Sequence, residues 1–233
     1  LVCDSLRTFT FPQNIKQVPR WILQYCDALT SVTLANGTTN IGEAAFADCP
    51  RLTTINITPE MPITFVGNYA FDDTGITSMT LPNSITEMGY CIFQNCHQLE
   101  SVNVPTGVDY VPYDYCEGCE NLKNVKMHDG IRVIRHDAFY GCRTLPSIEL
   151  NDQITHIEYD AFRNCDSLVI NKVPTALTHL GDNAFNRTSI TSANLPESIV
   201  EWGSGIFANN SKLKDVKLPK NIKRITNYMF QRC

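Results

Sequence analysis

The residues of this chain that most invite chemistry are its cysteines. Cys116 and Cys119 have the C-x-x-C spacing of thiol redox motifs, whose chemistry needs a helix N-terminus that lowers the thiol pKa. Only Cys91 and Cys116 lie outside one phase of an internal repeat, which favours buried structural thiols over a redox pair. The cysteines at the repeated phase are Cys3, Cys26, Cys49, Cys96, Cys119, Cys142, Cys165 and Cys233.

Two histidines and a glutamate share another phase of the repeat. His156 and His179 lie 23 residues apart, and Glu201 follows after 22 residues. Imidazole and carboxylate groups placed side by side on adjacent coils have the chemistry of metal ligands. The same phase also carries Glu87 and Arg224, which favours a solvated outward column. We therefore expect no metal site and no cofactor.

The third set is an aromatic column in which Tyr90, Tyr113, His136 and Tyr159 follow one another at intervals of 23 residues. Tyrosine rings supply contact area at low entropic cost and are enriched at binding surfaces. They also stack on one another without a partner, which is the alternative interpretation. We predict that these four residues form a partner-contact surface.

A fourth set is a polar column that would project outward from the predicted strands. Its N-terminal half is small and neutral, and its C-terminal half is charged. We predict Asn103, Lys126, Glu149 and Lys172 as further partner-binding residues, against the alternative of a polar surface that only suits sheet pairing. The full column is Thr10, Thr33, Asn56, Thr80, Asn103, Lys126, Glu149, Lys172, Asn194 and Lys217.

One repeat positions all four sets. The pattern A-F-x-x-C-x-x-L-x-x-I-x-L at 138–150 returns about every 23 residues, and its aromatic position recurs at intervals of 22 to 25. Such a period is typical of stacked-repeat proteins, whose units bury their apolar faces against one another. Segments such as 145–150 are expected to be short strands, segments such as 154–157 second extended pieces, and A-F-x-x-C a single turn of α- or 3₁₀-helix. These expectations describe an α/β solenoid of about ten coils.

Such a stack would align the cysteines into a cysteine ladder. Cys119, Cys142 and Cys165 would lie about 5 Å apart at their Cα atoms, which is within disulfide reach. However, in-register side chains point the same way, and each thiol has two equivalent neighbours. Thr74, Thr188 and Asn210 replace cysteine at this phase, which indicates a need for a small hydrogen-bonding side chain. We therefore expect mostly free, buried thiols.

Composition excludes several classes of protein. The chain is 43% hydrophobic and 18% charged, so an ordered core is expected. A net charge of −5 without a basic run argues against nucleic acid as a partner, and no apolar run approaches the ~18–20 residues that would insert into a membrane. No phosphate-binding loop, nucleophile elbow or zinc-protease motif occurs, so we expect no catalytic residue and no enzyme. Cys3 and Cys233 are ten periods apart, which predicts that residues 1–233 are a single solenoid domain excerpted from a longer array.

The repeat resembles the leucine-rich repeat superfamily, and specifically its BspA-like subclass of the form L-x-x-I-x-L-P-x-x-V-x-x-I-G-x-x-A-F-x-x-C. Residues 81–89 and 157–165 are close to that pattern. The departures are Cys116 in place of phenylalanine, Trp202 in place of isoleucine, and Asn171 in place of an aliphatic residue of the strand. We expect Asn171 to weaken the strand locally. The resemblance implies a right-handed leucine-rich-repeat superhelix with a parallel sheet on its concave face.

The resemblance also bears on function. Members of this family are mostly cell-surface or secreted proteins of bacteria and some protists that adhere to host matrix proteins or to other cells. It implies a cell-surface or secreted protein-binding and adhesion module, located extracellularly or on the cell surface, with a protein or glycoprotein partner. The alternative is an intracellular repeat scaffold for protein–protein assembly.

Overall fold

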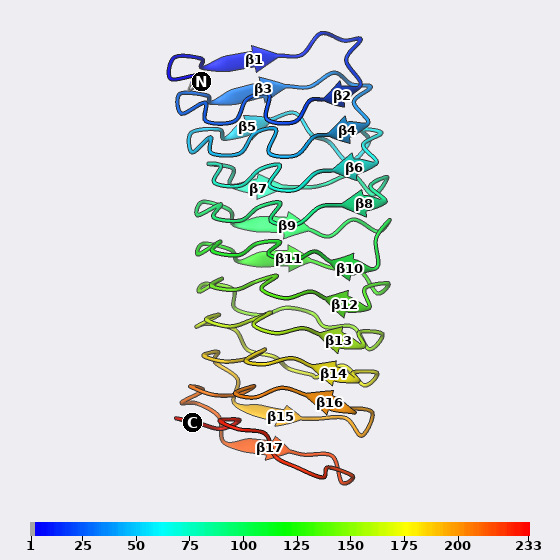
Figure 1. Ribbon diagram of the computed structural model, residues 1–233, viewed down its shortest axis with the longest axis vertical. Helices are drawn as coiled ribbons and strands as arrows, with labels where there is room; N and C mark the ends of the chain where they lie inside the picture. Colours follow the sequence, from blue (N-terminus) through cyan, green and yellow to red (C-terminus); the bar gives the residue numbers. More distant parts are fainter. Residues whose placement is uncertain (1–2) are drawn as a thin grey trace.

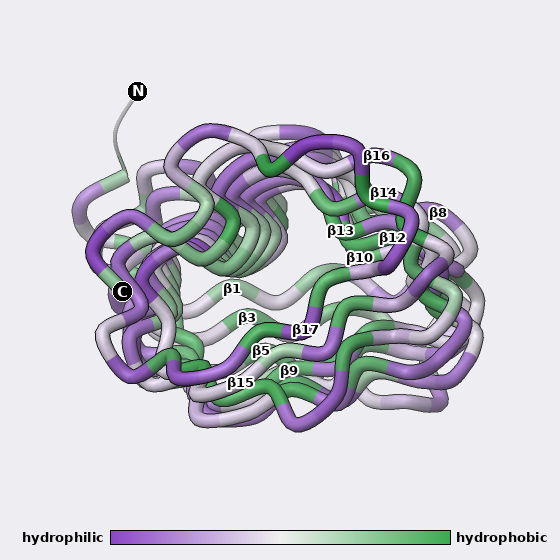
Figure 2. Tube along the Cα trace, turned by 90° about the horizontal axis from the view of Figure 1, so that it is seen from below, coloured by the Kyte–Doolittle hydropathy of each residue, from purple (hydrophilic) through white to green (hydrophobic). Residues whose placement is uncertain are grey.

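The computed structural model describes residues 3–233 as a stack of parallel strands wound into about nine turns, one fewer than expected (Figure 1). Most turns carry two short strands that lie on different sides of the coil (Figure 2). The strands of the first face are β1 (Thr8–Thr10), β3 (Ser31–Thr33), β5 (Thr54–Ile55), β7 (Ser78–Met79), β9 (Ser101–Asn103), β11 (Asn124–Lys126), β15 (Ser192–Asn194) and β17 (Asp215–Lys217). The strands of the second face are β2 (Gln17–Val18), β4 (Asn40–Ile41), β6 (Phe65–Val66), β8 (Glu87–Met88), β10 (Tyr110–Val111), β12 (Val133–Ile134), β13 (His156–Ile157), β14 (His179–Leu180) and β16 (Glu201–Trp202).

Strand pairing follows the sequence period. On the first face Val125 of β11 pairs with Val102 of β9, and on the second face Ile134 pairs with Ile157. In β9 and β11 the central valine is buried and its flanking polar residues are more exposed, which is the alternation that a half-buried strand requires. The predicted parallel strands and their register are therefore confirmed at most levels, but the strand expected at 145–150 is wrong, because this segment forms only a single bridge through Ser147.

The predicted helical turns are wrong, because residues 3–233 contain no helix. In every coil the A-F segment is flanked by two residues with positive φ four positions apart, such as Asp137 (φ 53°) and Gly141 (φ 74°). A right-handed helix needs φ near −63° at each residue, so this pair prevents even one turn. Aspartate, asparagine and glycine, which adopt the left-handed conformation most readily, fill most of these positions.

The turn is held by its neighbours in the stack instead of by helical hydrogen bonds. The N–H groups of Asp114, Cys116 and Gly118 donate to carbonyls of the next coil at 3.2, 2.8 and 2.8 Å. The residues in between bond locally, as Glu117 N–H does to the carbonyl of Asp114. We call this arrangement, which runs through all the coils, the turn ladder.

The core consists of columns of identical side chains. The buried rings of Phe139, Phe162 and Phe185 stack with centroids 5.4 and 5.5 Å apart and planes within 10° of parallel. Where Cys116 replaces phenylalanine, the preceding Tyr115 fills the space: its ring is fully buried and its hydroxyl donates to the carbonyl of Asn103 at 2.7 Å. The exchange conserves volume, which explains why this departure from the repeat is tolerated.

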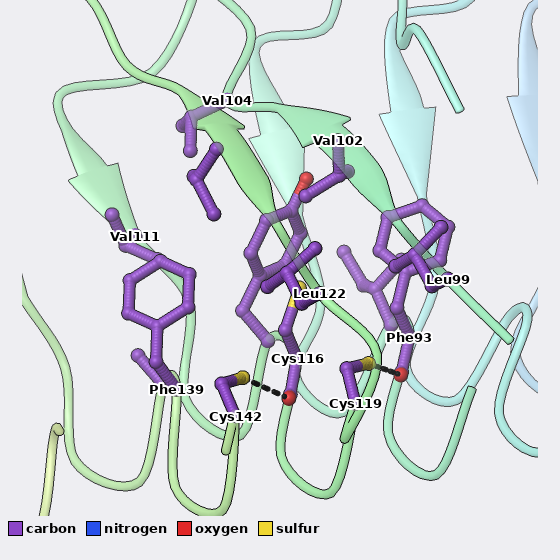
Figure 3. Packing of buried hydrophobic residues seen from close by; sticks show 14 of the residues in the cluster. Phe93, Leu99, Val102, Val104, Val111, Cys116, Cys119, Leu122, Phe139 and Cys142 are labelled. Atoms are coloured by element: carbon purple, nitrogen blue, oxygen red, sulfur yellow. Dashed lines mark hydrogen bonds between the residues drawn. The ribbon is translucent and has the colours of Figure 1, made fainter. Parts of the chain in front are cut away.

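The cysteine column binds backbone rather than sulfur. The thiols of Cys142 and Cys119 donate to the carbonyls of Cys116 and Phe93 on the preceding coil at 3.1 and 3.0 Å (Figure 3). All ten cysteines are free, and eight of them are buried, which confirms the expectation about the thiols.

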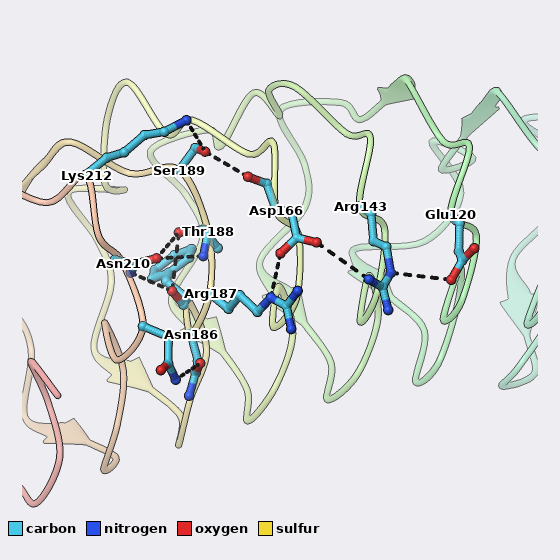
Figure 4. A network of polar contacts seen from close by, with 11 residues as sticks. Glu120, Arg143, Asp166, Asn186, Arg187, Thr188, Ser189, Asn210 and Lys212 are labelled. Carbon is cyan, nitrogen blue, oxygen red and sulfur yellow. Dashed lines mark hydrogen bonds and ion pairs between the residues drawn. The ribbon is translucent and has the colours of Figure 1, made fainter. Parts of the chain in front are cut away.

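Asn210 binds the preceding coil as the cysteines do, whereas Thr74 binds a carbonyl of its own coil. The Asn210 side-chain amide donates to the carbonyl of Phe185 at 2.8 Å, and its oxygen accepts the backbone N–H of Thr188 (Figure 4). The Thr74 hydroxyl donates to the carbonyl of Phe71 in its own coil at 2.9 Å. The site therefore requires a small hydrogen-bond donor and does not require sulfur.

Each strand ladder is interrupted, but at different levels of the stack. The first face breaks between β5 and β7, and again between β11 and β15, where a single bridge joins Ser147 to Val169. The strand is interrupted at Asn171, as predicted, but Asn171 does not occupy the core position: the Ser147–Val169 bridge shortens the register to 22 residues, so Ile170 is buried and Asn171 is exposed. Among the strands of residues 3–233, the second face from β2 to β16 breaks only between β8 and β10.

A proline accounts for the break in the second face. In other coils the residue after the strand donates its N–H to the preceding coil, as Gly89 does to the carbonyl of Val66 at 2.8 Å. Pro112 occupies this position after β10 and has no N–H to donate. The hydroxyl of Tyr110 instead accepts from the N–H of Met88 at 3.4 Å and donates to its carbonyl at 3.2 Å.

We predict that the phenol of Tyr110 replaces the missing peptide group. Tyr110→Phe should lower the free energy of unfolding by about 0.5–1.5 kcal/mol, because the Met88 carbonyl loses its partner. In a Pro112→Ala background the restored N–H should make that loss smaller. Urea denaturation of the four proteins of this double-mutant cycle measures the difference, and an equal loss in both backgrounds would contradict the explanation.

Candidate functional site

Three of the four residues of the predicted aromatic column stack on one another. The rings of Tyr113 and His136 have centroids 4.2 Å apart, and those of His136 and Tyr159 are 4.6 Å apart and nearly parallel. Each follows a strand of the second face, β10, β12 or β13, so the strand register places them on adjacent coils. Tyr90 lies at the same phase but packs edge-on against Tyr69 at 5.2 Å. We call Tyr113, His136 and Tyr159 the aromatic stripe.

The stripe is open to solvent at one end. Tyr159 is 47% exposed, whereas Tyr113 and His136 are partly buried. Tyr159 therefore presents one ring face that no other ring of the stripe covers.

An arginine and a glutamate fix the positions of these rings. The Cζ atom of Arg135 lies 5.0 Å from the ring centroid of Tyr113, and its guanidinium donates to the Tyr113 hydroxyl at 2.9 Å. Arg135 also pairs with Glu158 at 3.4 Å, and Glu158 accepts the backbone N–H of His136 at 3.0 Å. Sequence reasoning missed both residues. Their signal was available, because they occupy the position that is glycine in coils such as that of Gly89.

Three aspartates run alongside the stripe. Asp114, Asp137 and Asp160 each follow a stripe residue directly in the chain and hold the first positive-φ position of their turns. His136 Nδ1 lies 3.2 Å from a carboxylate oxygen of Asp137. Asp160 pairs through Oδ2 with Arg163 at 3.2 Å, while its buried Oδ1 has no hydrogen-bond partner among residues 3–233. We call these three residues the acidic column.

The carboxylates of the acidic column repel one another and are partly buried. Burial raises the pKa of Asp137, and the neighbouring charge of Asp160 raises it further. Burial also raises the pKa of Glu117, with Asp114 and Asp137 adding to the effect. Charged carboxylates are thus held close together without full compensation.

Two of these aspartates and the stripe histidine are the described residues that could hold a metal ion. The ligand atoms of Asp114, His136 and Asp137 all lie within 4.8 Å of one another. The expectation of no metal site considered repeat columns one at a time, and this set combines two adjacent columns. The chemistry that the set offers is two carboxylates and an imidazole, a donor set suited to a divalent cation.

The predicted histidine column is confirmed in its register. His156 pairs with His179 and His179 with Glu201, and the two imidazoles stack 4.1 Å apart. His179 Nε2 lies 3.1 Å from the Glu201 carboxylate. Nδ1 of each imidazole is 2.8 Å from the hydroxyl of the preceding threonine. Burial lowers the pKa of His156, and His179 lowers it further.

The four residues predicted on the first face do not form one continuous surface. Asn103 binds the backbone N–H and carbonyl of Leu81 at 2.7 and 3.0 Å, so its amide is engaged within the fold. Lys126 is exposed beside it in register. Glu149 is exposed and Lys172 pairs with Asp152, both where the first face is interrupted. This column lies on a different side of the coil from β10, β12 and β13, which carry the stripe (Figure 2).

The C-x-x-C pair is part of the core. Cys116 and Cys119 are fully buried, and burial raises the pKa of the Cys116 thiol well above its ordinary value, with Cys119 adding to the effect. Burial likewise raises the pKa of Cys49 to about 12. Thiol redox chemistry requires the opposite shift, so the expectation of buried structural thiols is confirmed.

Two stacked strand ladders, a 23-residue register and columns of buried phenylalanine define a leucine-rich repeat solenoid. The model of the BspA type leucine rich repeat region matches the sequence in six copies, over residues 2–100, 24–146 and 110–233. The chain therefore belongs to the BspA-type leucine-rich repeat family.

Solved structures with the same fold come from several bacteria. A leucine-rich cell surface protein from Faecalibacterium prausnitzii is 23% identical with a TM-score of 0.68, covering 98% of this chain and 73% of its own. A leucine-rich repeat protein from Bacteroides ovatus is 19% identical with a TM-score of 0.64, covering 99% and 77%. The leucine-rich repeat protein of T. pallidum is 26% identical with a TM-score of 0.52, covering 76% and 74%.

Two further findings concern relatives and membranes. No curated protein sequence matches this chain closely enough to count as a relative. Within residues 3–233 no helix has the length and apolar character that crossing a membrane demands.

We predict that thiol titration separates the buried cysteines from the exposed ones. Without reductant, all ten thiols should react with a chromogenic disulfide reagent in denaturant, because none is oxidised. In native buffer the exposed Cys3 and Cys233 should react quickly and the buried thiols slowly, since burial suppresses the reactive thiolate. A count well below ten in denaturant would show that disulfides form.

We also predict a pH-dependent destabilisation at Asp72. Burial, then the charges of Asp48 and Asp73, raise its pKa to about 7. Because the folded state binds this proton more tightly than the unfolded state, stability should fall as the pH rises from about 4 through about 7. Asp72→Asn should therefore raise the melting temperature at pH 8 and leave it unchanged at pH 4. The exposed control Asp4→Asn should show no such difference, and an equal effect at both pH values would refute the shift.

Proposed function

We propose that this chain is a cell-surface or secreted adhesion module that binds a protein or glycoprotein through its aromatic stripe. One observation carries the proposal: the three rings are stacked, are fixed by Arg135 and Glu158, and end in the half-exposed Tyr159. Rings that are already ordered lose little entropy when a partner covers them. A solenoid also offers a broad surface of the kind that repeat proteins use for protein partners.

The family supports this location and this class of activity. Leucine-rich repeat proteins typically serve as non-enzymatic binding scaffolds, and the Faecalibacterium prausnitzii structure is described as a cell surface protein. We propose that residues 1–233 act as a single binding domain, that the cysteine ladder has a structural role, and that no residue is catalytic. The net charge of −5 and the acidic column disfavour nucleic acid as a partner.

The second candidate is an intracellular scaffold for protein–protein assembly. The observation that favours it is the set of ten cysteines, all of them free thiols, a state typical of proteins kept in a reducing compartment. Staining of intact and permeabilised source cells with an antibody against this chain separates the two candidates. Signal on intact cells supports adhesion, and signal only after permeabilisation supports the scaffold.

We predict that the stripe contributes directly to partner binding. Binding of the protein to purified matrix proteins and to intact cells is measured by interferometry for the wild type and for Tyr113→Ala/Tyr159→Ala. The double variant should bind at least about tenfold more weakly, because central aromatic contacts commonly contribute more than 1 kcal/mol each.

The matched control is Tyr25→Ala/Tyr228→Ala, which removes two exposed tyrosines outside the stripe. It should retain wild-type affinity, and both variants should keep the wild-type circular dichroism spectrum. Unchanged affinity of the stripe variant, or an equal loss in the control, would remove the stripe from the proposal. Absence of binding to every matrix protein and cell type would favour the scaffold instead.

A further inference from the structure

One column of charges elsewhere in this protein alternates in sign over three successive coils. Glu120 pairs with Arg143 at 3.4 Å and Arg143 with Asp166 at 3.8 Å, and Asp166 also pairs at 2.8 Å with Arg187, which belongs to a neighbouring column (Figure 4). Alternation is what electrostatics favours when side chains stack at the spacing of adjacent coils, since like charges at that distance repel. It provides an internal standard for the acidic column.

The acidic column departs from that standard. Asp114, Asp137 and Asp160 are negative on three successive coils. Arg163 pairs with Asp160, and Arg135 is committed to Glu158. Among residues 3–233 no lysine or arginine forms an ion pair with Asp114 or Asp137. The one basic side chain that pairs with Asp137 is the imidazole of His136, which is charged only when protonated. Asp114 and Asp137 therefore lack the arginine partners that Glu120 and Asp166 have.

A second acidic surface continues beyond Tyr159. A hollow in the surface beside this ring is lined by the acidic residues Glu158, Asp182 and Glu201, by Tyr159 and Trp202, and by the imidazoles of His156 and His179. Glu158 pairs with Arg135 and Glu201 with His179, while Asp182 is in no ion pair among residues 3–233. No lysine or arginine is among its lining residues. The exposed tyrosine thus lies between two groups of carboxylates.

Aromatic faces and carboxylates together recognise one kind of ligand, an ammonium or guanidinium group. The ring face attracts the cation through its quadrupole, and the carboxylates neutralise it. The protein already contains one such contact, because the guanidinium of Arg135 lies over the Tyr113 ring and pairs with Glu158. Burial raises the pKa of Tyr159, and the charges of Asp137 and Asp114 add to the rise.

We propose that the aromatic stripe, the acidic column and the adjoining hollow form a site for a cationic segment of a protein partner. A lysine or arginine of that segment would lie against Tyr159 between Asp137 and the carboxylates of the hollow. This inference rests on the proposed function, since it names the chemistry of the partner that the stripe contacts. It makes the interaction charge-selective and sensitive to salt.

The test uses peptide probes of defined charge. Fluorescein-labelled Gly-Lys-Gly-Lys-Gly-Lys-Gly is titrated with the whole chain by anisotropy at 50 and 500 mM NaCl, next to its lysine-acetylated form and the glutamate analogue. The lysine peptide should bind and should lose at least about tenfold in affinity at high salt, because exposed charges are screened. The acetylated and glutamate peptides should bind at least about tenfold more weakly, because they lack the cation. Equal binding of the acetylated peptide would overturn the inference.

The variant is Asp114→Asn/Asp137→Asn, which removes two charges and keeps the shape. Asparagine fits the positive-φ position of this column, as Asn183 (φ 53°) demonstrates. The variant should bind the lysine peptide at least about tenfold more weakly, as expected for the loss of paired charges. The control Asp4→Asn/Glu60→Gln removes two exposed charges away from the site and should change the affinity less than about twofold.

Two other results would overturn the charge-selective site. Equal losses in the variant and the control would mean that the peptide senses only net charge. Calorimetric binding of Mg²⁺ or Zn²⁺ that is lost in Asp114→Asn/Asp137→Asn, without peptide binding, would assign these groups to a metal. A protein partner lost with Tyr113→Ala/Tyr159→Ala but not with the aspartate variant would overturn this inference and leave the proposed function intact. A partner lost with neither would overturn both.

Discussion

The structure depends on one repeated backbone hydrogen bond, from the N–H at the phenylalanine position to the carbonyl before the next phenylalanine. Phe139 donates to Ala161 at 2.9 Å and Phe162 donates to Ala184 at 3.0 Å. The bond forms only if successive coils are in register, so it aligns equivalent residues into columns. The chemistry of the side chains then decides whether a column stabilises the stack. Aromatic rings stack and thiols bind carbonyls, whereas carboxylates repel one another.

The elements that follow from the period alone could be predicted from the sequence. The parallel strands, the buried phenylalanines and the pairing of His156 with His179 all depend only on which residues share a phase. The turn could not be predicted from its apolar pattern, because Ala138 and Phe139 suit a helix while the φ angles of Asp137 and Gly141 forbid one. The relevant signal was the type of the flanking residues.

The candidate site was harder to predict because it combines columns and departs from the repeat. The aromatic column was visible at 23-residue spacing, but the turn of Tyr90 toward Tyr69 depends on side-chain packing that no periodicity encodes. Arg135 and Glu158 replace the glycine found in other coils, and the acidic column, although its aspartates recur every 23 residues, was assigned no role from the sequence. Tyr115 likewise compensates for Cys116 through a pair of changes, neither of which is informative alone. A site in a repeat protein therefore consists of what several adjacent coils share and the others lack.

The interruptions of the two strand ladders have a mechanical consequence. Where the first face is open, between β5 and β7 or between β11 and β15, the second face is paired, and where β8 and β10 are unpaired on the second face, β7 and β9 are paired on the first. The turn ladder crosses all these levels. The gaps are thus staggered along the stack. A tensile load along the stack axis therefore finds no level at which both strand ladders are interrupted. A crack that starts beside Pro112 must break peptide hydrogen bonds on the opposite face before it can separate two coils.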